Sequence, residues 1–129
     1  MNYSKYINYD SKRFYSDKQS LCLELVFHNV RYYNENNKTE FKVTLDKDEF
    51  TFEPTNDVLL DYMIYTICRF SKGEIKEDNA YGDIVIKLSN IIDNTVNKNT
   101  LKQKLSFFTF YLGNPERTKK FKNEVSNFL

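Results

Sequence analysis

Residues 20–33 read SLCLELVFHNVRYY, and this stretch decides which fold class the sequence predicts. Its apolar residues recur at every second position, which is typical of a β-strand. The residues on one face of such a strand are all apolar: Leu21, Leu23, Leu25 and Phe27. The residues on the opposite face are Cys22, Glu24, Val26 and His28. Because half of this second face is also apolar, we expect other elements to cover the strand on both sides.

Two shorter alternating stretches follow the polar loop at residues 34–38. The first covers residues 41–46 and has one apolar face. The second covers residues 50–53, and Pro54 ends it because proline has no N–H for a strand ladder. The acidic turn at residues 46–48 joins the two strands, so we predict a three-stranded antiparallel meander.

The chain after Pro54 carries helix signals. Apolar residues at helical spacing run from Leu59 to Phe70, and Gly73 is a natural stop for this helix. Residues 83–96 keep helical spacing too, although their β-branched start leaves a strand at 83–88 as the alternative.

Two further helices are predicted to meet at a sharp corner before Asn114. Thr100 and Gln103 have the spacing of a capping box, and the apolar stripe that follows runs to Leu112. Asn114 is expected to cap the last helix, with Pro115 at its first position.

Together these patterns predict an α+β fold. In this fold a three-stranded antiparallel β-meander is followed by three to four helices, packed on one face of the sheet in two layers. The 129 residues fit a single domain, 1–129. We divide it into a Tyr-rich arm at 1–19, the β-meander at 20–53 and a helical part at 55–129.

The composition is poor in the residues that most often perform catalysis, bind metals or cradle phosphate. The chain has one histidine, two cysteines, three glycines and no tryptophan, against ten tyrosines and eleven phenylalanines. Without zinc-ligand spacing or a glycine-rich phosphate loop, the sequence predicts neither a metal site nor a cofactor. Because no apolar stretch reaches the length of a membrane span and no secretory signal is present, we expect a cytoplasmic protein without membrane contact.

Cys22 and His28 share one face of the predicted strand, but their distance argues against a nucleophile–base pair. A strand rises about 3.3 Å per residue, which places the two side chains roughly 20 Å apart. A nucleophile and its base must approach to about 3 Å. We therefore predict that the chain is not an enzyme, and a site built on two carboxylates is the enzyme alternative that remains.

Tyrosines and acidic residues make up the predicted protein-binding site. Tyrosine is common in interfaces because it combines a large, rigid contact area with a polar tip. The acidic residues lie near the second hairpin, in a segment (residues 34–83) with a net charge of −6, and we expect them to steer a partner. The predicted protein-binding residues are Tyr3, Tyr6, Tyr9, Tyr15, Tyr32, Tyr33, Asp46, Asp48, Glu49 and Glu53.

We interpret the chain as a small non-enzymatic protein that acts stoichiometrically on a protein partner, as an inhibitor, immunity or accessory protein. Its small size and its bias towards Asn, Lys and Tyr resemble, in a general way, small accessory proteins of bacterial mobile elements. The same bias is typical of low-GC bacteria. A homodimer that forms through an exposed strand edge is compatible with this function.

A nucleic-acid-binding module is the alternative function. Residues 97–129 carry a net charge of +5, and basic side chains on helices contact phosphates. We rank nucleic acid below protein because this segment has no recognition-helix or ribonucleoprotein motif. The basic residues predicted to bind in this case are Lys102, Arg117, Lys119, Lys120 and Lys122.

Overall fold

The computed structural model describes residues 17–46, 49–52, 54–94 and 97–129. These ranges contain the helices α3 (Asp17–Asn37), α4 (Val58–Ser71), α5 (Glu77–Asn94), α6 (Lys98–Phe107) and α7 (Pro115–Phe128). They also contain one hairpin, formed by β1 (Val43–Asp46) and β2 (Glu49–Phe52). The described part of the chain is therefore mostly helical.

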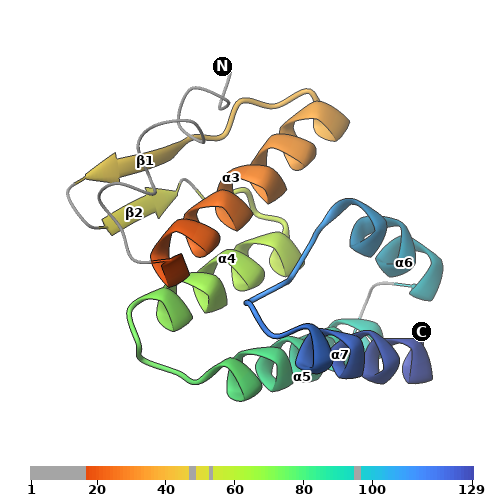
Figure 1. The fold of residues 1–129 in the computed structure, drawn as a ribbon. Helices are drawn as coiled ribbons and strands as arrows, with labels where there is room; N and C mark the ends of the chain where they lie inside the picture. The colour runs from red at the N-terminus through yellow and green to blue at the C-terminus, as the bar shows by residue number, and fades with distance from the viewer. Residues whose placement is uncertain (1–16, 47–48, 53, 95–96) are drawn as a thin grey trace.

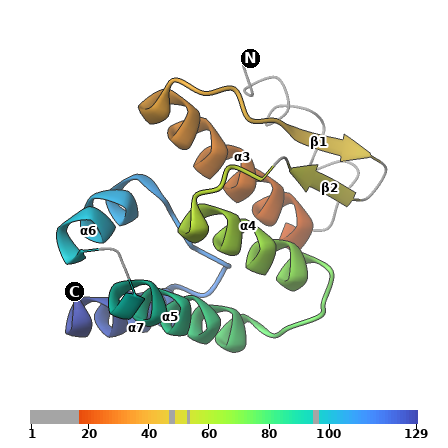
Figure 2. The same cartoon turned by 180° about the vertical axis from the view of Figure 1, so that it is seen from behind.

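The helices pack in chain order, apart from α6. Helix α3 packs against α4, α4 against α5, and α5 against α7. Figures 1 and 2 show the hairpin beside α3, at the opposite side of the molecule from α6. Helix α6 stands away from the other helices and connects to α7 through an extended segment at residues 108–112. Hollows can therefore form on both sides of α6.

The predicted α+β fold with a three-stranded meander is wrong, because residues 20–33 belong to α3. The apolar residues on both faces of the supposed strand come together on the buried side of a helix, where positions three and four apart are neighbours. These side chains are at most 1% exposed: Cys22, Leu23, Val26, Phe27 and Val30. The alternation arose because α3 is buried over a broad face, so Leu25 is covered as well.

The hairpin occupies the place of the second and third predicted strands. Its strands pair antiparallel, with Val43 opposite Phe52 and Asp46 opposite Glu49. Without a strand at residues 20–33 these two strands form no meander in the described ranges, and helices do not cover a sheet in a two-layer arrangement. The arm predicted at 1–19 lies outside the described residues up to position 16, and α3 begins at Asp17.

The start of α7 agrees with the prediction, whereas α6 differs from it at both ends. The Asn97 side chain caps α6 by accepting a 2.8 Å hydrogen bond from the Thr100 N–H, so Thr100 lies inside the helix and does not cap it. The helix ends at Phe107, in a run of aromatic and β-branched residues that disfavours helix. Asn114 caps α7 through the N–H groups of Glu116 and Arg117, as expected.

Asn29 of α3 fixes the extended segment that follows α6. Its amide nitrogen donates to the Thr109 carbonyl at 2.9 Å, and its amide oxygen accepts from the Thr109 N–H at 2.8 Å. The side chain thus pairs with Thr109 as a neighbouring strand would. Because Asn29 is fully buried, these two hydrogen bonds satisfy groups that have no access to water.

Tyr81 of α5 holds the other end of this segment. Its buried hydroxyl accepts the Leu112 N–H at 2.9 Å and lies 2.6 Å from the Thr118 hydroxyl of α7. Its ring packs against Phe110 and Phe121, with both pairs of ring centres 5.2 Å apart. Tyr81 therefore joins α5, the extended segment and α7 in one core.

Candidate functional site

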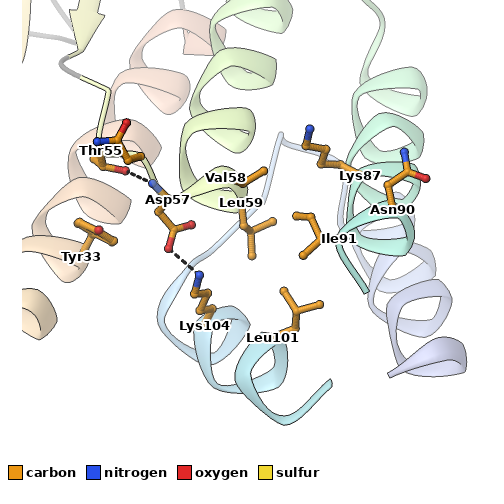
Figure 3. A pocket seen from close by; sticks show the side chains of 11 residues that line it. Tyr33, Thr55, Asp57, Val58, Leu59, Lys87, Asn90, Ile91, Leu101 and Lys104 are labelled. Atoms are coloured by element: carbon orange, nitrogen blue, oxygen red, sulfur yellow. Dashed lines mark hydrogen bonds and ion pairs between the residues drawn. The ribbon is translucent and has the colours of Figure 1, made fainter. Parts of the chain in front are cut away.

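Two hollows lie on opposite sides of α6. The first, which we call the polar cleft, has a volume of about 500 Å³. Its lining comes from α3, α4 and the residues before α4, α5 and α6, as Figure 3 shows. A smaller hollow of about 250 Å³ continues the cleft past Lys104 to Tyr32.

An ion pair between Asp57 and Lys104 lies at the centre of the polar cleft (Figure 3). The Asp57 carboxylate caps α4 by accepting the Leu60 N–H at 3.0 Å, and its other oxygen lies 2.8 Å from the Lys104 amine. The Asp57 side chain is only 7% exposed, so this pair is screened less by water than a surface pair. The ion pair therefore ties α6 to the start of α4.

Asp61 supports the same turn from inside the first turn of α4. Its carboxylate accepts the N–H groups of Thr55 and Asn56 and the Thr55 hydroxyl, all within 3.1 Å. Asn56 has a φ of 69°, a left-handed conformation that asparagine tolerates better than most residues. The carboxylates of Asp57 and Asp61 thus both accept hydrogen bonds from the turn at the start of α4, and Asp57 also pairs with Lys104.

The second hollow lies between α6, the extended segment and α7, and it has a volume of about 620 Å³. An adjoining hollow of about 380 Å³ extends it to the end of α7, and we call the two together the α6–α7 groove. Its lining is mainly apolar, and the apolar residues are Met63, Leu105, Phe108, Phe110, Phe121, Val125 and Leu129. Leu105, Phe108 and Val125 remain only half-buried, so the groove has apolar surface left to cover.

Four exposed lysines flank this groove. On α6, Lys98 and Lys102 are one helical turn apart on the flank that carries Leu105. On α7, Lys122 lines the groove with Val125, and Lys119 is one helical turn before Lys122. Lys102 and Lys122 themselves line the two hollows. In the described part of the chain, none of the four forms an ion pair.

The basic residues predicted for nucleic-acid binding are divided by the structure. Arg117 points towards α5, where its guanidinium pairs with Asp78 and with Glu124 and lies 4.8 Å from the centre of the Tyr81 ring. Its side chain is only 12% exposed, so Arg117 acts in the core. Lys120 lies on the flank of α7 that faces away from the groove, because its helical position is on the opposite side from Val125, which lines the groove. Of the five, Lys102 and Lys122 line the α6–α7 groove, and Lys119 lies one helical turn from Lys122.

The residues predicted for protein binding do not form one surface among the residues that the structure describes. Tyr32 and Tyr33 lie half-buried in the last part of α3, where Tyr32 packs edge-on against His28 at 4.5 Å and Tyr33 lies 5.9 Å from Phe41. Asp46 and Glu49 are paired in the backbone register at the end of the hairpin. The remaining residues of that prediction lie outside the described residues: Tyr3, Tyr6, Tyr9, Tyr15, Asp48 and Glu53.

The groove residues were not predicted as a site, because their helical spacing placed them in the core. Leu105, Phe108 and Val125 belong to apolar stripes that are typical of buried faces. The feature of the sequence that distinguishes these groove residues from core residues is the polar character of α6. Its ten residues (KNTLKQKLSF) include three lysines and no acidic residue. A helix of this kind cannot bury its whole apolar stripe against the body of the protein.

The cysteines and the histidine have shifted pKa values with simple causes. Burial raises the pKa of Cys22 to about 11 and that of Cys68 to about 12, so both thiols stay protonated at neutral pH. Burial, with a smaller effect of Arg31, lowers the pKa of His28. Protonated thiols are poor nucleophiles, so the two cysteines serve as packing residues.

Neither a metal centre nor a membrane helix is present in the ranges that the structure describes. No group of three or more histidine, cysteine, aspartate or glutamate side chains is placed to hold a metal ion there. None of the helices in these ranges is both long and apolar enough to cross a bilayer. Comparisons with protein-family models, curated proteins and solved structures found no match to this chain.

Proposed function

We propose that this chain is a binding protein that acts stoichiometrically on a protein partner and holds it in the α6–α7 groove. The observation that supports the proposal is the apolar lining of an open groove of about 620 Å³. Leu105, Phe108 and Val125 are half-buried in the free chain, so a partner gains free energy by covering them. The fully buried core of a protein interface is more apolar than the rest of the surface, which fits these three residues.

The rim of the groove has the composition of an interface. Tyr111 is 36% exposed at one edge, and its hydroxyl donates to the Gly113 carbonyl, so its ring is held in place. A rigid aromatic side chain loses little conformational entropy when a partner binds it. The apolar floor and the aromatic edge together favour a protein partner.

A partner-capture experiment with a steric block tests this proposal. Ser126 is exposed and lines both parts of the groove, so Ser126→Trp fills the groove without removing a core side chain. Ser89 is an exposed serine on α5 that lines neither the groove nor the cleft, so Ser89→Trp is the matched control. Both variants should keep the wild-type circular dichroism spectrum and urea midpoint.

We expect the wild-type protein and Ser89→Trp to retain the same partner from a lysate of the source cells, at a fixed molar ratio. Ser126→Trp should recover at least ten times less of it, and cross-links from the wild-type complex should map to α6 and α7. Equal recovery by Ser126→Trp and Ser89→Trp, or cross-links confined to other helices, would overturn the proposal.

The nucleic-acid alternative rests on the four exposed lysines around the groove. Phosphates bind lysines through charge alone, and such binding weakens steeply with salt. The apolar floor between the lysines favours protein, because a phosphate backbone leaves that floor uncovered. A gel-shift assay at low salt with wild type, Lys122→Glu and Lys120→Glu tests the alternative. Retardation that only Lys122→Glu weakens would favour nucleic acid at the groove, because Lys122 lines the groove and Lys120 does not.

A further inference from the structure

We propose that the segment held in the α6–α7 groove is an amphipathic helix whose apolar stripe is flanked by Asp or Glu residues. This inference rests on the proposed function and adds the chemistry of the partner. It follows from the charge of the two rims, the length of the groove and the apolar floor between the rims.

The charge of both rims is positive. Lys98 and Lys102 lie on the α6 side and Lys119 and Lys122 on the α7 side, all exposed. Helix α6 contains no acidic residue, and Glu124 of α7 points away from the groove to pair with Arg117. A partner that lies in the groove therefore meets cations along both of its edges, and acidic flanks complement them.

The length of the groove matches a short helix. The residues that line the groove on α7 run from Thr118 to Ser126, which corresponds to about 12 Å of helix at 1.5 Å per residue, and those on α6 run from Lys102 to Ser106. A bound helix of two to three turns spans this length. Its anchors are expected at positions i, i+3, i+4 and i+7, the spacing by which helices bind in apolar grooves.

The apolar floor favours a helix over an extended segment. Backbone N–H and C=O groups that enter an apolar groove need hydrogen-bond partners. A helix satisfies these groups within itself, whereas an extended segment needs a neighbouring strand. The adjoining backbone of Thr109 already pairs with Asn29, and the Leu112 N–H already bonds to Tyr81.

Two synthetic peptides test the charge and the helix together. Both have sixteen residues, a fluorescein label and Leu at i, i+3, i+4 and i+7. One carries Glu on both flanks of the stripe and the other carries Lys at the same positions. Fluorescence anisotropy with the full-length protein gives each Kd at 50 mM and 300 mM NaCl, and circular dichroism follows the peptide helix.

We expect the Glu peptide to bind at least ten times more tightly than the Lys peptide at 50 mM NaCl, with a smaller ratio at 300 mM NaCl. An exposed ion pair changes affinity by a factor of about 1.5 to 5, and a like-charge pair weakens binding by a similar factor, so four sites that change from attraction to repulsion give this ratio. Salt screens exposed pairs and reduces it. The peptide should also gain helix on binding.

Charge reversal on the protein provides the second arm. The double variant Lys102→Glu/Lys122→Glu should lose most of the preference for the Glu peptide, because each rim then carries one lysine and one glutamate. The matched control is Lys76→Glu/Lys120→Glu, which changes the net charge equally through exposed lysines outside the groove. The control should keep the preference for the Glu peptide within twofold.

Several outcomes would overturn the inference. These are equal Kd values for the two peptides, no measurable binding of either, a preference that the control variant also loses, or peptide binding without gain of helix. Displacement of the Glu peptide by a 20-base-pair duplex would assign the lysines to nucleic acid instead. Sedimentation that shows a dimer abolished by Ser126→Trp would assign the groove to a second copy of the chain.

The peptide and capture experiments fail in different ways. If Ser126→Trp abolishes partner capture but the peptides bind equally, the groove is a binding site and the acidic-helix inference alone is wrong. If Ser126→Trp changes neither partner capture nor peptide binding, the proposed function is wrong as well.

Discussion

Replacement of Tyr81 by phenylalanine measures how strongly one hydroxyl holds the core beneath the groove. The Thr118 hydroxyl donates to the Asn114 carbonyl at 2.9 Å, so its proton is committed there. Tyr81 therefore donates to the Thr118 oxygen and accepts the Leu112 N–H. Tyr81→Phe keeps the ring contacts with Phe110 and Phe121 and removes only this link.

The magnitude follows from what the deletion leaves behind. Leu112 is 3% exposed, so its N–H loses its partner in a place that water does not reach. A buried donor left unsatisfied costs about 1–3 kcal/mol. The Thr118 oxygen loses a donor as well, which adds about 0.5–1.5 kcal/mol, the net value of an ordinary hydrogen bond. We expect Tyr81→Phe to lower the free energy of unfolding by about 2–4 kcal/mol.

Urea unfolding followed by circular dichroism gives this free energy, and Tyr111→Phe is the control. Tyr111 also donates a hydrogen bond, to the Gly113 carbonyl, but its side chain is exposed and water can replace that partner. The control should lie within about 0.5 kcal/mol of wild type. Equal midpoints for Tyr81→Phe and Tyr111→Phe would refute the reasoning, because the buried Leu112 N–H would then need no partner.

Three further measurements test other parts of the structure. Thiol-specific reagents at pH 8 should react with Cys22 about 100-fold more slowly than with a thiol of pKa 9.0, and more slowly still with Cys68; urea should restore the reaction of both. Because the pKa of His28 is lowered in the folded chain, His28 binds a proton at higher pH in the unfolded chain than in the folded chain. The free energy of unfolding should therefore fall more between pH 7.5 and 5 for wild type than for His28→Gln. Equal slopes would contradict this cause. Asn29→Ala should cost about 2–4 kcal/mol, since two buried bonds are lost, and hydrogen exchange at the Thr109 amide should accelerate; unchanged exchange would show that Asn29 does not hold this segment.

The fold could be predicted from the sequence where a local signal was unambiguous. Asn114 followed by Pro115 determines the start of α7, because a side-chain cap and a proline at the first position both favour a helix there. Gly73 follows α4 with a φ of 79°, a conformation that glycine adopts without strain. These signals depend on a few neighbouring residues and not on the rest of the fold.

The fold could not be predicted at α3, because burial over a broad face of this helix obscured the helical spacing of its apolar residues. In α3, Leu23, Leu25 and Phe27 alternate as in a strand, but Cys22 and Val26, which would lie on the opposite face of that strand, are buried as well. A helix covered by α4 on one side and by the segment that contains Thr109 on another buries residues of either period.

The end of α6 could not be read from the sequence because tertiary contacts decide it. The stripe from Leu101 to Leu112 has helical spacing throughout, yet the chain leaves the helix at Phe107. The contacts of Asn29 with Thr109 and of Tyr81 with Leu112 join residues 80 and 31 positions apart, so no local pattern contains them. The α6–α7 groove exists because of this early end.

The position of α6 links the two hollows of the molecule. Leu101 is fully buried, and the Asp57–Lys104 ion pair holds the flank that faces the polar cleft. The opposite flank, with Leu105, is the wall of the groove. The ion pair and the core contact of Leu101 therefore orient this ten-residue helix, and the groove on its far side stays open.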